Sequence, residues 1–209
     1  MQPIRKLLVA LLLLLTTAAF ASAEPLPSHV VWVRAALGRA PVSKFDNTPE
    51  RRELRETQLD AFAREIARVS AVAPLPPRMW GSLILAQGQI ESNYDTAVVD
   101  GKCLKFQCDP HLVKGEVVHK AVGAFQQQLV SYVSDVWGKA AGNIPLQVEM
   151  ADRSLRRSMT RCKPFAAFPA HVFRAYGGGS CSWPAPREAE RIAAYLRAMA
   201  TPMPSEGAS

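Results

Sequence analysis

The sequence predicts a mainly α-helical protein built around a single domain. In several segments apolar residues recur at steps of three and four, which is the spacing of one helix face. Helix-start signals open two of these segments, at Thr48-Pro49-Glu50 and at Asn143-Ile144-Pro145. No segment has a strong strand pattern and no useful internal repeat occurs. A chain of 209 residues that is 48% hydrophobic and 21% charged suits one domain, and this composition excludes disordered and collagen-like chains.

The first 23 residues are expected to be a secretory signal peptide. Arg5 and Lys6 precede an apolar run that ends near Ala21, and Ala21-Ser22-Ala23 supplies small residues for a signal-peptidase site. An uncleaved membrane anchor is the alternative, but this run of about 15 residues is shorter than the roughly 20 that span a bilayer. We expect no later membrane span. The mature chain should therefore begin near Glu24 and be exported, to the periplasm or the extracellular space.

Residues 24–47 are expected to form an extended or weakly ordered arm, because they have no clear period and contain three prolines. The domain is predicted over 48–200. Its first helix begins at the Thr48 cap, places Leu59, Phe62 and Ile66 on one stripe, and ends before Pro74. Arginines and glutamates, Arg55 among them, alternate on the face that we expect to be solvated.

The rest of the domain is predicted as helices joined by loops. The segment 94–120 has little period, several turn residues and a close pair of cysteines, so we expect a disulfide-containing loop there. The last helix should start at Pro186 with Ile192 and Leu196 inward, and a disordered tail should follow over 201–209. The other expected helices run from Pro77 to about Asn93, over 122–137, over 144–158 and over 165–174.

The charge balance is basic but moderate. Removing the leader, which holds two basic residues and no acidic one, lowers the formal net charge from +7 to +5. The basic runs are short and have acidic neighbours, whereas a nucleic-acid-binding protein gathers its charge on one face. We therefore expect no nucleic-acid partner. Mild attraction to an anionic polymer of the cell envelope fits this balance better.

Four cysteines in an exported chain are expected to form two disulfides. Three connectivities are possible, and the spacing favours Cys103–Cys108, which closes a small loop, together with Cys162–Cys181, which closes a longer one. A zinc site is the alternative because His111 and His119 lie near Cys108. However, the cysteines have no Cys-x2-Cys pair, which makes the pattern a poor match to zinc sites. We expect no metal.

One carboxylate occupies an unusual position in the second predicted helix. Trp80, Ile84, Gln87 and Glu91 follow one another at steps of four, three and four, so they share one face. Glu91 therefore lies on the inward side of an apolar helix, in its last turn. Burial and the negative end of the helix dipole both raise the pKa of such a carboxyl group, which suits a proton donor. The alternative is that Glu91 pairs with a buried arginine, and periodicity leaves both interpretations open.

Three short strings around this helix resemble a known family. Glu91-Ser92 ends the helix, Gly123-Ala124-Phe125-Gln126 follows the loop, and Ala175-Tyr176-Gly177-Gly178 comes later. Their order and helical setting resemble the soluble lytic transglycosylases and goose-type lysozymes, whose pattern has Glu-Ser, Gly-x-x-Gln and Ala-Tyr-Asn-x-Gly. The resemblance covers residues 78–200 and implies a lysozyme-like fold.

The resemblance also implies an activity and roles for individual residues. Glu91 would cleave peptidoglycan glycan strands, first as general acid on the glycosidic oxygen and then as base. Ser92 would support the site by hydrogen bonding, and Gln126 and Tyr176 would line the groove and hold the sugar. The alternatives are helix surface for Gln126 and core packing for Tyr176. No cofactor is implied, and we expect a monomer whose partner is the glycan strand.

The sequence also departs from the family pattern. Gly177 replaces the asparagine of Ala-Tyr-Asn-x-Gly, and the long loop after Glu91 carries two cysteines. Most glycosidases use two carboxylates, and Asp95, Asp100 and Asp109 lie in that loop without a motif. A lone glutamate favours intramolecular transglycosylase chemistry over hydrolysis by water. A lysozyme-type hydrolase and a non-catalytic peptidoglycan-binding module remain as alternative hypotheses.

Overall fold

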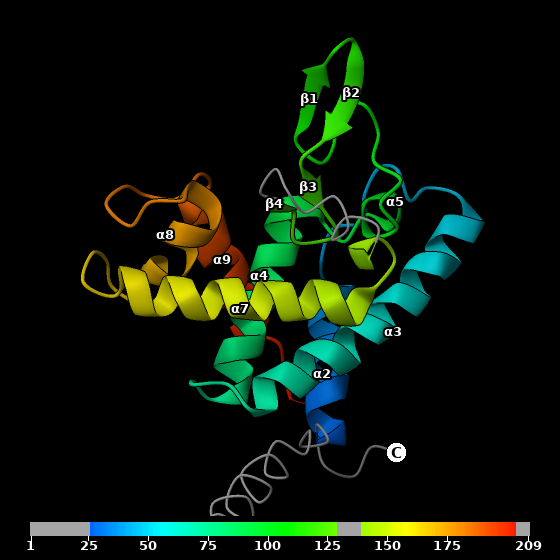
Figure 1. Cartoon of the computed structure of the whole chain (residues 1–209). Helices are drawn as coiled ribbons and strands as arrows, with labels where there is room; N and C mark the ends of the chain where they lie inside the picture. Colours follow the sequence, from blue (N-terminus) through cyan, green and yellow to red (C-terminus); the bar gives the residue numbers. More distant parts are fainter. Residues whose placement is uncertain (1–25, 129–138, 204–209) are drawn as a thin grey trace, which may run out of the picture.

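The computed structural model describes residues 26–128 and 139–203. The predicted signal peptide, the end of the predicted tail and the segment 129–137 of the predicted helix over 122–137 lie outside these ranges. The described residues are mainly helical, as predicted, and Figure 1 shows a group of helices from which one hairpin projects. The helices are α2 (Pro27–Gly38), α3 (Pro49–Ala71), α4 (Pro77–Ser92), α5 (Thr96–Val99), α7 (Ile144–Cys162), α8 (Ala170–Gly178) and α9 (Glu188–Met199).

The predicted helix-start signals are confirmed where the sequence marks them. The Thr48 hydroxyl accepts a hydrogen bond from the Arg51 amide at 3.3 Å, and Pro49 follows as the first residue of α3. The Asn143 side chain caps α7 by accepting from the Leu146 amide at 3.1 Å. Each cap satisfies a backbone N–H that has no partner within its helix.

α4 lies at the centre of the fold. It packs against α9, α3, α7 and α2, and α7 also packs along α8 and α3 (Figure 1). The α4 residues from Trp80 to Gly88 are buried, because neighbouring helices cover this helix on several sides. Its last turn, which contains Glu91, is only partly covered. The core thus fixes the position of this turn and leaves one side of it accessible.

The prediction of an extended arm over 24–47 is wrong for Pro27–Gly38, which form α2. Trp32, Val33 and Leu37 of this helix are fully buried, and the Trp32 indole donates to the Thr201 carbonyl at 3.1 Å. Thr201 is itself buried, so the predicted tail is ordered at its first residue. The period was missed because apolar residues such as Val31, which is 53% exposed, also lie on the outer side of α2, so the buried stripe does not stand out in the sequence.

The predicted loop over 94–120 also contains regular structure. β1 (Pro110–Val113) and β2 (Glu116–His119) pair antiparallel, with Val113 opposite Glu116, and form the hairpin that projects from the helices in Figure 1. Lys114 and Gly115 make its turn with φ of 52° and 87°. Strands of four residues with mostly exposed side chains carry no alternating apolar pattern, so the sequence did not predict them.

The helix predicted over 122–137 is wrong in its described part. Ala121–Val122 form β3, which pairs antiparallel with β4 (Gln127–Gln128), and a tight turn joins them. Gly123 begins this turn at a φ of 69°, and a Cβ there would lie 2.5 Å from the Gln147 side chain. Glycine is therefore required at this position. The apolar residues after Val122 are spaced like a helix face, although the described part of this segment forms a turn.

Both predicted disulfides are confirmed. Cys103 pairs with Cys108 below the hairpin, and Cys162 at the end of α7 pairs with Cys181 in the segment before α9. No described cysteine is free, which removes thiolates as possible metal ligands in those ranges. None of the described helices is both long and apolar enough to cross a membrane.

Candidate active site

Glu91 lies in the last turn of α4, with its side chain 20% exposed. The helix ends directly after it because Asn93 adopts a left-handed conformation with φ of 54°. The Arg187 guanidinium donates to the Ile90 carbonyl at 2.8 Å and so satisfies one of the last carbonyls of the helix. The turn that carries Glu91 is thus held from the side of α9 as well as by the core.

The two oxygens of the Glu91 carboxyl group have different surroundings. Oε1 accepts hydrogen bonds from the Gln87 amide at 2.6 Å and from Arg191 at 2.9 Å. The buried Arg191 also donates to the Gln87 side-chain oxygen at 2.7 Å, which orients the amide toward Glu91. Oε2 has no hydrogen-bond partner in the described parts of the chain. Oε1 is therefore anchored, and Oε2 is the oxygen available to a ligand.

The two interpretations that the sequence left open for Glu91 do not exclude each other. The carboxyl group pairs with Arg191, whose side chain is only 4% exposed, and its pKa is nevertheless raised. Burial is the largest cause of the raised pKa, because it disfavours the charged form. Arg191, Arg187 and Gln87 act in the opposite direction but do not outweigh burial. Glu91 thus holds its proton to a higher pH than an exposed glutamate.

Two adjoining cavities meet at Glu91. The first, of about 640 Å³, extends from Glu91 over the segment 42–45 and the base of the hairpin. The second, of about 470 Å³, extends past Tyr176 to α7. Glu91, Asp109 and Gln126 line both cavities, so the accessible carboxyl group lies where they join. This arrangement leaves room for an extended ligand on both sides of one carboxyl group.

Ser92 connects the end of α4 to the turn between β3 and β4. Its hydroxyl donates to the Ala124 carbonyl at 2.7 Å and accepts from the Tyr94 amide at 3.1 Å. It also lines the first cavity. Ser92 therefore fixes the turn relative to Glu91.

Gln126 belongs to the turn between β3 and β4, and Tyr176 of α8 contacts this turn. The Gln126 amide donates to the Gly123 carbonyl at 3.0 Å within the turn, and φ at this residue is 47°. The Tyr176 hydroxyl donates to the Phe125 carbonyl at 2.8 Å, which ties α8 to the same turn. Both line the second cavity with Glu91. The structure thus brings together all four predicted site residues, Glu91, Ser92, Gln126 and Tyr176.

The three loop aspartates have different positions. Asp95 is buried, accepts from the Ala97 and Val98 amides at 3.0 and 3.2 Å, and caps α5. Asp100 accepts from the Gln58 amide at 2.8 Å. Asp109 lines both cavities, and its carboxylate lies 3.2 Å from the His111 imidazole. Asp95 also lines the first cavity, but of these three only Asp109 lines both cavities with Glu91.

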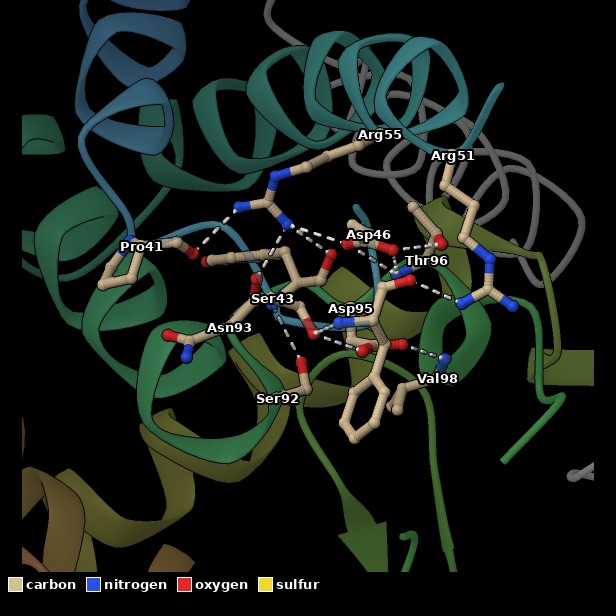
Figure 2. A network of polar contacts seen from close by, with 12 residues as sticks. Pro41, Ser43, Asp46, Arg51, Arg55, Ser92, Asn93, Asp95, Thr96 and Val98 are labelled. Atoms are coloured by element: carbon tan, nitrogen blue, oxygen red, sulfur yellow. Dashed lines mark hydrogen bonds and ion pairs between the residues drawn. The ribbon is translucent and has the colours of Figure 1, made fainter. Parts of the chain in front are cut away.

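A buried polar network that the sequence did not reveal holds the chain just after Glu91 (Figure 2). Arg55 of α3 donates to the Asn93 and Tyr94 carbonyls, both at 2.9 Å, and pairs with Asp46 at 3.5 Å. Asp46 in turn accepts from the Thr96 hydroxyl at 2.6 Å. Arg55 was predicted on a solvated face but is only 3% exposed. It links α3 and the segment before it to the end of α4.

Arg191 was also missed, because the predicted inward stripe of the last helix is displaced. Leu196, expected to be inward, is 57% exposed, whereas Arg191 is buried. The inward position of Glu91 does indicate that a partner exists, because an isolated buried glutamate requires a cationic or hydrogen-bonding partner. Sequence spacing does not say which of many arginines supplies it.

The described residues contain no group of three histidine, cysteine, aspartate or glutamate side chains that could hold a metal ion. Comparisons with protein-family models, curated proteins and solved structures give no match to this chain. The chemistry of the site must therefore be argued from its own geometry and from the three short motifs.

Proposed function

We propose that the protein cleaves the glycan strands of peptidoglycan by a lytic transglycosylase-like mechanism, with Glu91 as general acid and then as base. One observation carries this proposal: a buried carboxyl group of raised pKa has one anchored and one available oxygen at the junction of two cavities. A general acid for a polymer needs this combination of retained proton, fixed orientation and room on both sides. The family resemblance of the surrounding strings supports the same assignment.

In the first step the proton on Oε2 of Glu91 passes to the glycosidic oxygen as the bond between that oxygen and the sugar carbon breaks. The electron pair of the bond leaves with the oxygen, so positive charge develops on the sugar ring and Glu91 becomes a carboxylate. Arg191 and Gln87 already donate to Oε1, and they stabilise the carboxylate as it forms. This preorganisation compensates for the cost of ionising a buried group.

In the second step Glu91 recovers its proton. The carboxylate accepts it from the primary hydroxyl of the same sugar, and the hydroxyl oxygen bonds to the ring carbon to give an anhydro end. No water is consumed. Gln126 and Tyr176 would hold the sugar in the second cavity, and Ser92 would keep the turn that carries Gln126 in place.

Hydrolysis of the same bond is a second candidate, and Asp109 is the observation that favours it. Its carboxylate lines the same two cavities as Glu91, where it could orient a water molecule. A hydrolase would produce a reducing end instead of an anhydro end. A non-catalytic peptidoglycan-binding module, which Gly177 in the family's asparagine position suggests, would produce no fragments.

Digestion of purified peptidoglycan tests these three possibilities together. Soluble fragments would be identified by mass spectrometry, because an anhydro end lacks the one water that a reducing end contains. The proposal predicts anhydro ends. Reducing ends would favour hydrolysis instead. If fragments were released no faster than in an enzyme-free blank, only the binding module would remain.

The proposal places the protein outside the cytoplasm, in the periplasm or the extracellular space, where peptidoglycan lies. The predicted signal peptide and the two disulfides support this location. Amino-terminal sequencing of the protein from the secreted or periplasmic fraction tests this location directly. The proposal predicts a mature chain that begins near Glu24.

A further inference from the structure

The second cavity has two arginines on its α7 wall that the proposed mechanism does not use. Arg157 and Arg161 line it together with Glu91 and Tyr176. They are one helical turn apart on α7, so they lie on the same face. Neither makes an ion pair or a side-chain hydrogen bond with any residue in the described ranges.

The other two arginines of α7 are paired. Arg153 forms an ion pair with Glu149, and Arg156 pairs with Asp152 at 2.8 Å, each with the acidic residue one turn earlier. One turn before Arg157 lies Arg153, and one turn before Arg161 lies Arg157, so neither has an acidic residue at that position. Like charges one turn apart destabilise a helix. The helix therefore gains nothing from the Arg157–Arg161 pair, and its stability does not explain the pair.

The two adjoining cavities form one groove, and its negative and positive side chains lie in different places. Glu91 and Asp109 supply carboxyl groups where the two cavities meet, and the arginine pair supplies two positive charges at the α7 side of the second cavity. The sugar rings of a glycan are neutral and require no cation. A ligand that carries acidic groups beside its backbone would meet these charges. Arginine suits such groups because its planar guanidinium can bind a carboxylate with two parallel hydrogen bonds.

We propose that Arg157 and Arg161 bind carboxylates of the peptide stems attached to the glycan, so that the groove selects stem-bearing, acidic strands. The inference rests on the proposed function, because it identifies side groups of the substrate in the same groove. The strand lies along Glu91, Gln126 and Tyr176, and its stem extends toward α7. Both arginines are exposed, so they remain hydrated and act as selectivity determinants rather than as the main source of affinity.

The test compares untreated peptidoglycan with peptidoglycan whose carboxylates have been converted to amides by carbodiimide and ammonia. The variant is Arg157→Gln/Arg161→Gln, which removes both charges and keeps polar side chains. Its matched control is Arg52→Gln/Arg153→Gln, which removes two charges from exposed positions that do not line the cavity. Initial rates of fragment release are measured for each protein on both materials.

Wild-type and control proteins should cleave untreated material about fivefold faster than amidated material, as expected for two exposed charge pairs of up to about 0.5 kcal/mol each. The Arg157→Gln/Arg161→Gln protein should lose this preference and match the wild-type rate on amidated material. A preference that survives in this variant, or a wild-type protein with none, would overturn the inference.

A second measurement separates this inference from the proposed function. The same substitutions are placed in the Glu91→Gln background, and sedimentation with both materials is measured without cleavage. If no protein releases fragments, the proposed function fails, and the binding data still decide the role of the arginines. Binding that falls on amidation only when Arg157 and Arg161 are present supports the inference. Equal binding of both materials by the protein that keeps both arginines contradicts it. A decrease in binding on amidation that persists in the Arg157→Gln/Arg161→Gln protein also contradicts it, because other groups would then recognise the carboxylates.

Discussion

Arg191 opposes the effect of burial on the pKa of Glu91, the residue that we propose as the catalytic acid. Its charge favours the carboxylate form of Glu91, whereas burial favours the protonated form and has the larger effect. The same contact fixes Oε1 and leaves Oε2 accessible. Arg191 therefore acts as a positioning residue that also limits how far the pKa of Glu91 rises.

Substituting Arg191→Met should raise the pKa of Glu91 further, because the positive charge and its hydrogen bond are lost. The general acid would then stay protonated to higher pH, and the basic limb of the profile of kcat/KM against pH should move upward. The profile is measured with peptidoglycan as substrate. Arg197→Met, at an exposed position of the same helix, should leave the limb in place. A limb that moves downward or does not move in Arg191→Met would contradict this account.

The raised pKa of Glu91 also predicts how stability depends on pH. In wild-type protein the stabilising effect of the protonated carboxyl is complete below its unfolded-state pKa of about 4.3 and is lost as pH rises through the higher folded-state value. Glu91→Gln does not titrate. Its free energy of unfolding relative to wild type should therefore increase over the pH range above about 4. Urea denaturation at several pH values measures this difference, and a difference that decreases over that range would mean a lowered pKa.

At the scale of elements, the helices whose apolar residues follow one stripe in the sequence were predictable, and α2 was not. α3, α4 and α7 begin at the capping residues or prolines that the sequence offers, since a cap is a local interaction. α2 was missed because apolar residues such as Val31 also lie on its exposed side, so its buried stripe does not stand out. The burial of Arg55 and Arg191 was missed because it depends on carbonyls and carboxylates supplied by other elements.

α2 should therefore contribute substantially to stability. Trp32 is fully buried and hydrogen-bonded to Thr201, so Trp32→Ala should lower the free energy of unfolding by about 3–5 kcal/mol. Val31→Ala, at a neighbouring side chain that is 53% exposed, should change it by less than about 0.5 kcal/mol. Urea denaturation of the three proteins gives both values. Equal stabilities would mean that the segment is the unstructured arm that the sequence suggested.

At the scale of the whole molecule, the groove is assembled from parts far apart in the chain. Short motifs singled out Glu91, Ser92, Gln126 and Tyr176, and all four lie at the two cavities, although Gln126 is in a turn and not in the predicted helix. The hairpin and the arginine pair of α7 have no motif, so only the folded arrangement places them beside Glu91. The cysteine pairing was predictable from spacing alone, since few connectivities exist for four residues.

The two disulfides should differ in their effect on stability. Cys162 and Cys181 are separated by 19 residues and Cys103 and Cys108 by 5, so the first closes the larger loop. By loop-closure entropy, replacing the first pair by alanine should cost about 3 kcal/mol and replacing the second about 2 kcal/mol. Urea denaturation of the two double variants tests the order. A larger loss for the pair at 103 and 108 would show that the hairpin base stabilises the fold by other means.

The most direct test of the central claim is the initial rate at which Glu91→Gln releases soluble fragments from peptidoglycan. Gln keeps the shape and the hydrogen bonds of the side chain but has no proton to donate, so the rate should fall by about 10²–10⁴. Glu53→Gln, at an exposed position of α3, provides the matched control and should cleave at the wild-type rate. Cleavage by Glu91→Gln at the wild-type rate would contradict the assignment of Glu91 as the general acid.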